Sequence, residues 1–491
     1  MPMEAAGVGL WDGTACSAAV TKSRISPRIV WLILALTTIV AAALRFPFLD
    51  HQSLWLDEIF TREILGESSL PGVWHHVAKT ESTPPLYYVI GWFAGAHSAV
   101  SMRVIPALAL TATVPVSYVA FRRLVGERAA LATAAILAVS PMLVSYSTDA
   151  RSYGLLVFTG LLTVWGFSAV LEHPSSGRYG RWALACVACV WTHYFGGFLV
   201  IAEVAILLVL RPPERLATLG WLLIIAVCTG PLVPLVAGQA SGERAAFIET
   251  EPLVSRVLMT VRQVAIGANV PRNWLEGSGL AVWWLAVASG AIIAIRGDRG
   301  ARMVLILAAG SVGLPLLMGL AGIEDRFYSR NVIVAMPTVA ALAATVMLRL
   351  RAAPLVCYLT LALVTAVWVA TDWRYEQTDW RDAISRVEAV DSRAPIIAVA
   401  PYSAQVVSTY LGRKAVSPAG LVTKSVWIMV APIRGPHDRT LVSVPALAVR
   451  GFRTVRELKP YDFRLILAVA NRPTHIVSGV VSYSTVFPGG L

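Results

Sequence analysis

The chain has 491 residues, of which 56% are hydrophobic and 14% charged, and its mean hydropathy is +0.66. This composition excludes an ordinary soluble globular protein. Apolar runs of about 18 or more residues recur through most of the first 370 positions, and each is long enough to cross about 30 Å of hydrocarbon as a helix. The sequence therefore predicts a polytopic α-helical membrane protein.

The net charge of +12 does not indicate a nucleic-acid-binding protein. Many of the Lys and Arg residues lie in short loops between apolar runs, where they set the topology in the bilayer. The five cysteines are scattered and imply no disulfide framework. We therefore expect the lipid bilayer as a partner and no nucleic acid.

The chain begins with a basic stretch, residues 1–28, that we interpret as a cytoplasmic tail. Ile29–Ala43 follows Lys22, Arg24 and Arg28, and no secretory cleavage site is evident, so this run is expected to be retained as the first span. Residues 49–102 then form a large outer loop. The apolar run Pro84–Ala96 within this loop is too short for a span and predicts an interfacial helix near 84–96.

Basic loops give the topology of the rest of the membrane domain, residues 29–371. If these loops are cytoplasmic, the chain crosses the membrane about eleven times and its C-terminal region is exported. The intervening outer loops then contain Asp57, the 147–153 turn, the His193 turn, residues 238–277 and residues 324–331. The basic loops are marked by Arg122 with Arg123, Arg178 with Arg181, Arg211 with Arg215, Arg296 with Arg302, and Arg349 with Arg351.

The composition changes near Asp372, and residues 372–491 predict a soluble extracytoplasmic α/β domain. Asp379–Ile384 has helical spacing, with Ala383, Val387 and Val390 available to one face. Pro395–Ala400 is a short apolar run that is typical of a strand.

Four clusters in the outer loops contain residues suited to binding or catalysis. Asp57 and Glu58 are adjacent and point in different directions in a helix or strand, so they are expected to have separate roles. Arg326 and Arg330 lie where the positive-inside rule predicts few cations, which suggests an anionic ligand. The other two clusters are the Tyr146–Tyr153 segment and the Thr192–Gly197 turn. Solvated acids, helix caps and interface anchors are the ordinary alternatives for these residues.

Together these clusters contain what a lipid-phosphate-linked substrate requires. A guanidinium matches phosphate oxygens, and a carboxylate can accept the proton of an attacking hydroxyl. A departing phosphate needs little acid catalysis when a cation pairs with it. An apolar groove between spans would hold a polyprenyl tail.

The order of these motifs resembles that of the GT-C superfamily of polyprenyl-phosphate-sugar-dependent glycosyltransferases, in the RgtA/B/C/D-like branch. That branch is related to the protein O-mannosyltransferases and the lipid A aminoarabinose transferase. The resemblance covers about residues 30–385. Its motifs are Trp55-Leu56-Asp57-Glu58, Pro84-Pro85-Leu86-Tyr87-Tyr88, Arg103 before Pro106-Ala107-Leu108, Tyr146–Tyr153, Thr192-His193-Tyr194-Phe195, Arg330 before Pro337, and Asp379-Trp380-Arg381.

The resemblance implies a GT-C fold and a role for each site residue. It assigns Asp57 as catalytic base with Glu58 in support, and Arg330 and Arg326 as ligands of the donor phosphate. It places Asp149, Arg151, Tyr153, His193, Tyr87 and Tyr88 at the substrate. The chain departs from the family at Thr83, where His is frequent, at Asp149, where Glu is frequent, and at Asn331, where Tyr is common.

We therefore expect an enzyme of the bacterial plasma (inner) membrane with its active site on the extracytoplasmic face. It would transfer a sugar, with mannose or arabinose as the candidates, from a polyprenyl-phosphate donor to an envelope glycan, lipid or protein acceptor. A lipid-linked-glycan flippase or transporter and a non-enzymatic envelope scaffold are the alternatives. Asp57, Glu58 and Asp149 could also bind a divalent cation, Mg²⁺ or Mn²⁺, as hard oxygen ligands.

Overall fold

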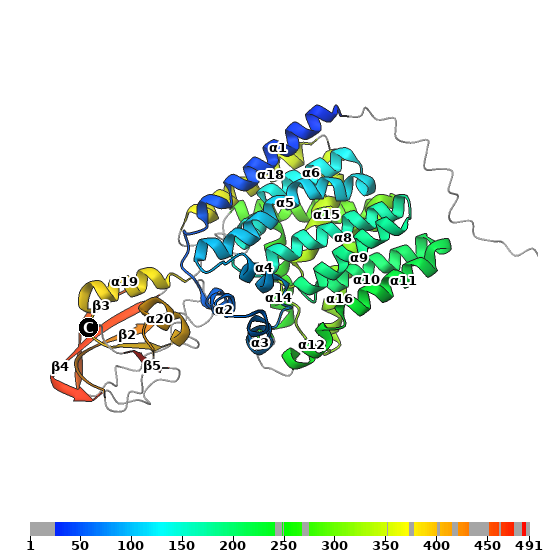
Figure 1. Ribbon diagram of the computed structural model, residues 1–491. Helices are drawn as coiled ribbons and strands as arrows, with labels where there is room; N and C mark the ends of the chain where they lie inside the picture. Colours follow the sequence, from blue (N-terminus) through cyan, green and yellow to red (C-terminus); the bar gives the residue numbers. More distant parts are fainter. Residues whose placement is uncertain are drawn as a thin grey trace, which may run out of the picture.

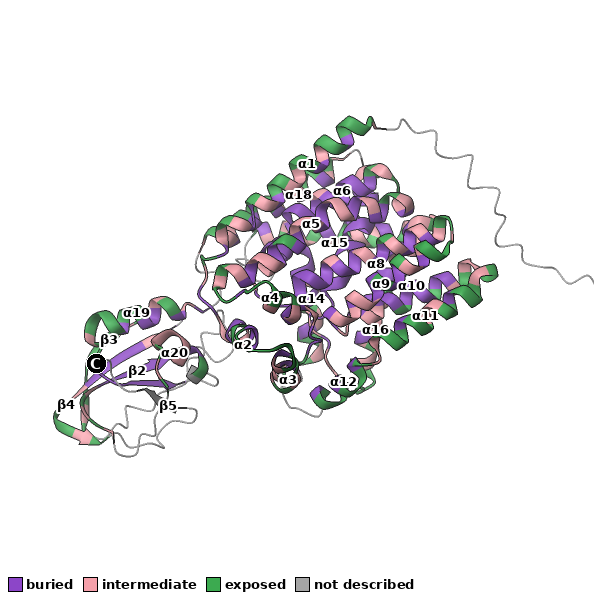
Figure 2. Cartoon of the chain, viewed as in Figure 1, coloured by how far each residue is buried: buried purple, intermediate pink, exposed green. Residues whose placement is uncertain are grey.

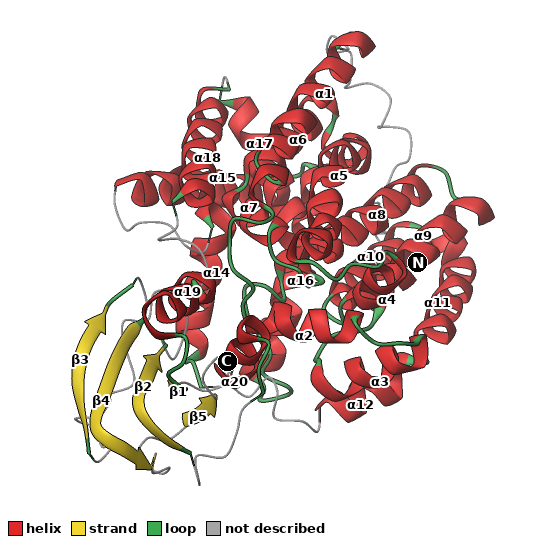
Figure 3. Cartoon of the chain, turned by 60° about the vertical axis from the view of Figure 1, so that its left-hand side comes forward, coloured by secondary structure: helices red, strands yellow, loops and turns green. Residues whose placement is uncertain are grey.

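The protein combines a large helical bundle with a smaller five-stranded sheet (Figure 1). The computed structural model describes residues 25–240, 248, 250–267, 274–350, 352–372, 378–399, 403–414, 421–431, 451–460, 463–475 and 484–487. Residues 1–24 of the expected cytoplasmic tail lie outside the described residues. Figure 3 shows the strands gathered at one end of the molecule, next to helices α19 and α20.

The bundle contains the long apolar helices. Their bounds are α1 (Pro27–Ala43), α5 (Ala99–Val125), α6 (Glu127–Val139), α7 (Pro141–Ser147), α8 (Tyr153–Glu172), α9 (Ser176–Thr192), α10 (Gly196–Leu210), α11 (Arg215–Thr229), α15 (Trp274–Ile295), α16 (Arg299–Leu320), α17 (Met336–Arg349) and α18 (Ala353–Thr371). The shorter elements are η1 (Phe46–Phe48), α2 (Leu56–Leu65), α3 (Leu70–Thr80), α4 (Leu86–Phe93), η2 (Pro212–Glu214), α12 (Leu232–Ala240), α14 (Leu253–Ile266) and η4 (Ile333–Ala335).

Within the described residues, six helices are long and apolar enough to span a membrane, or up to eight if the bent pairs α6–α7 and α10–α11 each count as one span. The prediction of about eleven spans is not confirmed by this count. The reason is helix length: α9 has 17 residues and α17 has 14, fewer than the roughly 20 that a 30 Å core requires. Pro141 and Pro212 also start new helical segments after the breaks.

The outer surface of the bundle is apolar, as a lipid-facing surface requires. Trp31 of α1 is 68% exposed and Leu216 of α11 is 84% exposed. Figure 2 shows exposed residues along the outward sides of α1 and α11 and buried residues in the interior of the bundle. These surfaces support membrane insertion of the bundle.

The predicted basic loops meet at one end of the bundle. Glu172, at the end of α8, pairs with Arg123 at 2.7 Å and with Arg178 at 3.9 Å, and its carbonyl oxygen accepts a hydrogen bond from Arg211. Arg349 pairs with Asp298 at the α15–α16 turn. The turns therefore occur where the basic residues predict them, and the remaining turns lie at the other ends of the same helices.

Helices α5 and α8 pack closely near the start of α8. A Cβ atom on Gly154 would meet Pro106 Cβ at 2.8 Å, so only glycine allows this approach. The contact brings the 148–152 turn beside Arg103, which lies near the start of α5. Sequence-distant polar groups are thereby placed next to one another.

The 49–102 segment folds into helices α2, α3 and α4 at the end of the bundle where α5 and α8 begin. Helix α4 has only eight residues and cannot span the membrane, as predicted for the 84–96 region. Its position in the membrane interface stays a prediction. Buried apolar residues of this segment share a core with the sheet: Leu54, Ile59 and Val77 belong to the same cluster as Trp380 and Trp427.

The C-terminal region contains the predicted helix and strand. Helix α19 (Trp380–Asp391) is capped by Asp379, whose side chain accepts the Asp382 amide, and β1 spans Ile396–Val399. The other elements are α20 (Ser403–Leu411), β2 (Val422–Val430), β3 (Phe452–Leu458), β4 (Arg464–His475) and β5 (Ser484–Phe487). Among the described residues the strand order is β3-β4-β2-β1-β5, with β1 and β2 parallel and the other neighbouring pairs antiparallel.

The C-terminal region is docked on the segment that precedes α2. The Tyr410 hydroxyl accepts the Leu54 amide at 2.6 Å and donates to the Leu54 carbonyl oxygen at 3.3 Å. Ser53 donates to the Thr378 carbonyl oxygen and accepts the Trp380 amide. Contacts from α19 and α20 thus fix the backbone three to four residues before Asp57.

Candidate active site

The candidate site lies where the start of α2 meets the 148–152 turn and the 324–332 loop. Asp57 and Glu58 occupy the first turn of α2, where helix N-termini stabilise negative charge. The closing of α5 on α8 brings the 148–152 turn beside them. Four of the predicted residues, Asp57, Glu58, Asp149 and Arg151, therefore come together from two distant segments.

Glu58 is completely buried and fully engaged. Its carboxylate accepts two hydrogen bonds from Arg103, Nε to Oε1 at 2.7 Å and Nη2 to Oε2 at 2.5 Å, and a third from the Ala150 amide at 2.9 Å. The remaining guanidinium hydrogens of Arg103 go to the carbonyl oxygens of Leu49, Gln52 and Ser53. Glu58 therefore joins α2, α5 and the 148–152 turn, which agrees with a supporting role and leaves no room for direct chemistry.

A second buried ion pair lies beside the first. Arg151 donates two hydrogen bonds to Glu81, at 2.7 and 2.5 Å, and also donates to the Asp57 carbonyl oxygen and the Thr61 hydroxyl. Burial opposes the charge of Arg151, but the adjacent Glu81 outweighs it and raises the pKa of Arg151 well above its usual value. Arg151 thus holds the backbone of α2, and its contact with substrate stays a prediction.

Asp57 differs from its neighbour because it is loosely paired. Its Oδ2 lies 3.5 Å from Nη1 of Arg330, and the two side chains are 24% and 18% exposed. The Arg330 guanidinium lies 5.7 Å from the Tyr153 ring centroid and 5.4 Å from that of Tyr328, within range of cation–π attraction. Burial opposes the charge of Arg330, but neighbouring groups, including Asp57, raise its pKa above the usual value. A permanent cation therefore lies beside an accessible carboxylate.

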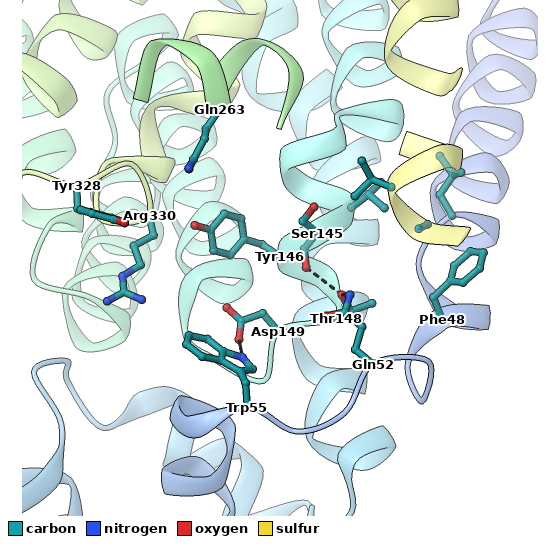
Figure 4. A pocket seen from close by; sticks show the side chains of 14 residues that line it. Phe48, Gln52, Trp55, Ser145, Tyr146, Thr148, Asp149, Gln263, Tyr328 and Arg330 are labelled. Carbon is teal, nitrogen blue, oxygen red and sulfur yellow. Dashed lines mark hydrogen bonds between the residues drawn. The ribbon is translucent and has the colours of Figure 1, made fainter. Parts of the chain in front are cut away.

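Asp149 completes this group. Its Oδ1 accepts a hydrogen bond from the Trp55 indole nitrogen at 3.3 Å (Figure 4). Burial, followed by the charge of Glu58, raises the pKa of Asp149 to about 7. Near neutral pH this carboxyl can therefore both donate and accept a proton, unlike an ordinary surface aspartate.

A cavity of about 170 Å³ adjoins Asp149 and Arg330 (Figure 4). Its aromatic lining residues are Phe48, Trp55, Tyr146 and Tyr328. Its polar lining residues are Gln52, Ser145, Thr148, Asp149, Gln263 and Arg330. Its aliphatic lining residues are Leu44, Val144, Val369 and Ala370. Elements α1, η1, α7, α14 and α18 thus contribute walls to a mixed aromatic and polar cavity.

The other predicted site residues have different surroundings. Tyr153 is 4% exposed and lies between Arg330 and His193. His193 is 3% exposed, its Nδ1 accepts the Phe195 amide, and burial followed by Arg330 and Arg151 lowers its pKa to about 3. His193 is therefore a neutral, interior side chain that packs against Tyr153.

Tyr87 and Tyr88 are fully buried, and their predicted contact with substrate stays a prediction. The Tyr87 hydroxyl donates to the Met102 carbonyl oxygen, and the Tyr88 hydroxyl lies 3.5 Å from that of Thr83. Arg326 pairs with Glu324 at 3.2 Å and is not among the residues that line the cavity. Arg330 is thus the better placed of the two predicted phosphate ligands.

Several site residues received no role from the sequence. Arg103 belonged to a motif, but its pairing with Glu58 depends on the α5–α8 packing. Glu81, an acid just before Pro84-Pro85, gave a weak signal, and Gln263 gave none. Within the described residues, no group of three His, Cys, Asp or Glu side chains is arranged to hold a metal ion. The three predicted ligands do not form such a group because Arg103 and Ala150 occupy the Glu58 carboxylate.

Comparisons with known proteins agree with this architecture. A family model described as dolichyl-phosphate-mannose-protein mannosyltransferase matches residues 82–236. The structure is similar to the crystal structure of ArnT from Cupriavidus metallidurans bound to undecaprenyl phosphate, with a TM-score of 0.55 and 14% identity over 93% of this chain and 100% of that chain. No curated protein sequence matches the chain.

Two further structures are less similar. The Archaeoglobus fulgidus oligosaccharyltransferase aligns with a TM-score of 0.43 and 14% identity, over 73% of this chain and 55% of that chain. The arabinofuranosyltransferase AftD from Mycobacteria aligns with a TM-score of 0.42 and 13% identity, over 92% of this chain and 40% of that chain. The assignment of the fold depends on ArnT alone.

The apolar bundle and the polar site at one of its ends define a polytopic membrane protein with a candidate active site at the ends of its helices. The family model matches residues 82–236, which is part of the chain, and the similarity to ArnT shows a shared fold.

Proposed function

We propose that the protein is a membrane glycosyltransferase that moves a sugar from a polyprenyl phosphate to a hydroxyl acceptor. The observation that carries this proposal is the loose Asp57–Arg330 pair beside a mixed polar and aromatic cavity. A carboxylate and a cation 3.5 Å apart can act on the same displacement reaction. The carboxylate acts on the attacking hydroxyl, and the cation acts on the departing phosphate. The undecaprenyl phosphate bound to ArnT supports a lipid phosphate as the leaving group.

The reaction can be written from these residues. The acceptor oxygen forms a bond with the anomeric carbon, and the proton of its hydroxyl moves to the Asp57 carboxylate. The bond between the anomeric carbon and the phosphate oxygen breaks, and its electron pair stays on the phosphate. Arg330 stabilises the negative charge that develops there. An in-line displacement of this kind inverts the anomeric centre.

The finer assignments are also proposals. The donor sugar is mannose or arabinose, and the acceptor is an envelope glycan, lipid or protein. We place the protein in a bacterial plasma membrane with the site on the extracytoplasmic face, because the basic loops gather at the opposite end of the bundle. Eleven spans follow if the α6–α7 pair crosses once and α1, α5, α8–α11 and α15–α18 cross once each.

A lipid-linked-glycan transporter would place ionisable side chains along a path through the bundle. Glu203 of α10 is the candidate for such a residue. Its carboxyl is fully buried, where it accepts hydrogen bonds from Thr163 at 2.8 Å and from the Trp182 indole at 2.7 Å. These partners tie α8, α9 and α10 together, so Glu203 supports packing of the bundle more than passage of a substrate.

The test is transfer by purified protein in lipid nanodiscs with radiolabelled undecaprenyl-phosphate mannose and arabinose and an envelope extract as acceptor. We expect one donor to release undecaprenyl phosphate as its label appears in the acceptor. Absence of release from every polyprenyl-phosphate sugar would contradict the proposal and favour transport or scaffolding.

A further inference from the structure

Two buried glutamines at this end of the bundle are bonded very differently. Gln239 is 5% exposed, its amide oxygen accepts the Tyr194 hydroxyl at 2.7 Å, and its amide nitrogen donates to the carbonyl oxygens of Val77 and Thr83. Gln263 is 8% exposed, and its amide oxygen is buried without a hydrogen-bond partner among the described residues. Gln263 and Arg330 both line the cavity, and Figure 4 shows the amide nitrogen of Gln263 directed into it.

A buried amide oxygen without a donor costs about 1–3 kcal/mol. The oxygen is satisfied if the amide turns over, because this exchanges its two ends and presents the oxygen to a ligand in the cavity. Tyr146, Tyr328, Ser145 and Thr148 line the same cavity, and the Ser145 and Thr148 hydroxyls, which donate to backbone carbonyl oxygens, keep the capacity to accept a hydrogen bond. Rings that cover apolar C–H faces, together with amide and hydroxyl groups, suit a compact polyhydroxylated molecule.

We propose that this cavity holds the sugar ring of the lipid-linked donor, and that Gln263 determines sugar specificity by accepting a hydrogen bond from a ring hydroxyl. This inference rests on the proposed glycosyltransferase function. Arg330 belongs both to the cavity wall and to the pair with Asp57. A phosphate on Arg330 would therefore leave its attached sugar ring within reach of Gln263.

The test measures equilibrium binding to purified protein in nanodiscs, by displacement of radiolabelled undecaprenyl phosphate. The competitors are undecaprenyl phosphate itself and its mannose and arabinose esters. The selectivity ratio is the Kd of undecaprenyl phosphate divided by the Kd of the sugar ester. Gln263→Leu should lower this ratio about three- to tenfold for the preferred ester, the value of one neutral hydrogen bond, and leave the Kd of undecaprenyl phosphate unchanged.

Gln239→Leu is the matched control, because it removes a buried glutamine amide outside the cavity and should leave the ratio unchanged. Gln263→Asn, which retracts the amide by one methylene, gives a second variant if Gln263→Leu does not fold. An unchanged ratio in both Gln263 variants, or no ester that binds more tightly than undecaprenyl phosphate, would overturn the inference alone. Failure of all three lipids to bind would overturn the proposed function as well.

Discussion

Glu58 and Asp57 are neighbours in the chain, but they belong to two polar regions with different construction. The Glu58 region, with Arg103, Arg151 and Glu81, is buried, and its carboxylates are bonded to guanidinium groups at 2.5–2.7 Å. The region of Asp57 and Arg330 is partly exposed, has a 3.5 Å pair and borders a cavity. A saturated network maintains geometry, whereas a loosely paired one can exchange its partner for substrate.

Changes in the buried Glu58 region should have the largest effect on stability. Arg103→Ala leaves the Glu58 carboxylate buried without its cation and frees the loop that Arg103 holds, so we expect a loss of about 3–5 kcal/mol. Thermal unfolding in detergent measures this loss. Arg386→Ala is the control, because its exposed pair with Asp382 on α19 should contribute about 0.5 kcal/mol or less. Equal destabilisation by the two changes would contradict the distinction between the regions.

Changes in the partly exposed region of Asp57 and Arg330 should instead weaken the binding of substrate. Arg330→Ala removes the proposed phosphate ligand, so the donor KM should rise about 10- to 100-fold, as expected for hydrogen bonds to a charged group. The loss of thermal stability should be smaller than for Arg103→Ala, because the pair with Asp57 is long and partly exposed. Arg330→Lys should restore only part of the affinity, because it keeps the charge without the planar donor fork. An unchanged donor KM would exclude Arg330 as the phosphate ligand.

Asp149 gives a prediction that depends on pH. Its pKa is raised from 3.8 to about 7 in the fold, mainly by burial, so the folded state retains the proton that the unfolded chain loses. Its contribution to stability is complete below about pH 4 and is lost as the pH rises through about 7. Asp149→Asn cannot ionise, so the melting temperature of the variant minus that of the wild type should increase between pH 4 and pH 7 and then level off. A constant difference would contradict the raised pKa.

The smallest effect is expected where the C-terminal region contacts the segment that precedes α2 and Asp57. Tyr410→Phe removes the oxygen that accepts the Leu54 amide. Hydrogen exchange of that amide, followed by mass spectrometry, should become about 3- to 10-fold faster, because one hydrogen bond is lost. Tyr118→Phe, whose hydroxyl bonds Glu127 toward the other end of α5, is the matched control and should leave exchange near Leu54 unchanged. Equal exchange in both variants would mean that α20 does not hold this segment.

Residues grouped in short motifs were predictable. Asp57 and Asp149 were recognisable because each lies in a polar turn beside an apolar helix, and Arg330 because a cation there conflicts with the basic-loop pattern. The predicted helix at Asp379–Ile384 and strand at Pro395–Ala400 are confirmed because local spacing and β-branched composition determine them.

The side chains that each site residue contacts were not predictable from the same sequence patterns. Arg151 was expected at the substrate, but Glu81, 70 residues earlier, takes its guanidinium. Tyr87 and Tyr88 were also expected at the substrate, and both are fully buried. Gln263 lies on a helix without a motif, and only the structure distinguishes it from Gln239, by its position at the cavity and by an amide oxygen without a partner among the described residues. Pairing of this kind depends on the close contact of Gly154 with Pro106. Local sequence patterns do not predict this contact.

The most direct test of the central claim compares the two adjacent acids in one experiment. Transfer from the preferred polyprenyl-phosphate sugar and the melting temperature are measured for wild type, Asp57→Asn and Glu58→Gln. If Asp57 is the base, Asp57→Asn should transfer about 10²- to 10⁴-fold more slowly with a melting temperature within about 2 °C of wild type. Glu58→Gln should instead lower the melting temperature, because a neutral amide cannot pair with buried Arg103. Near-normal transfer by Asp57→Asn would contradict the account.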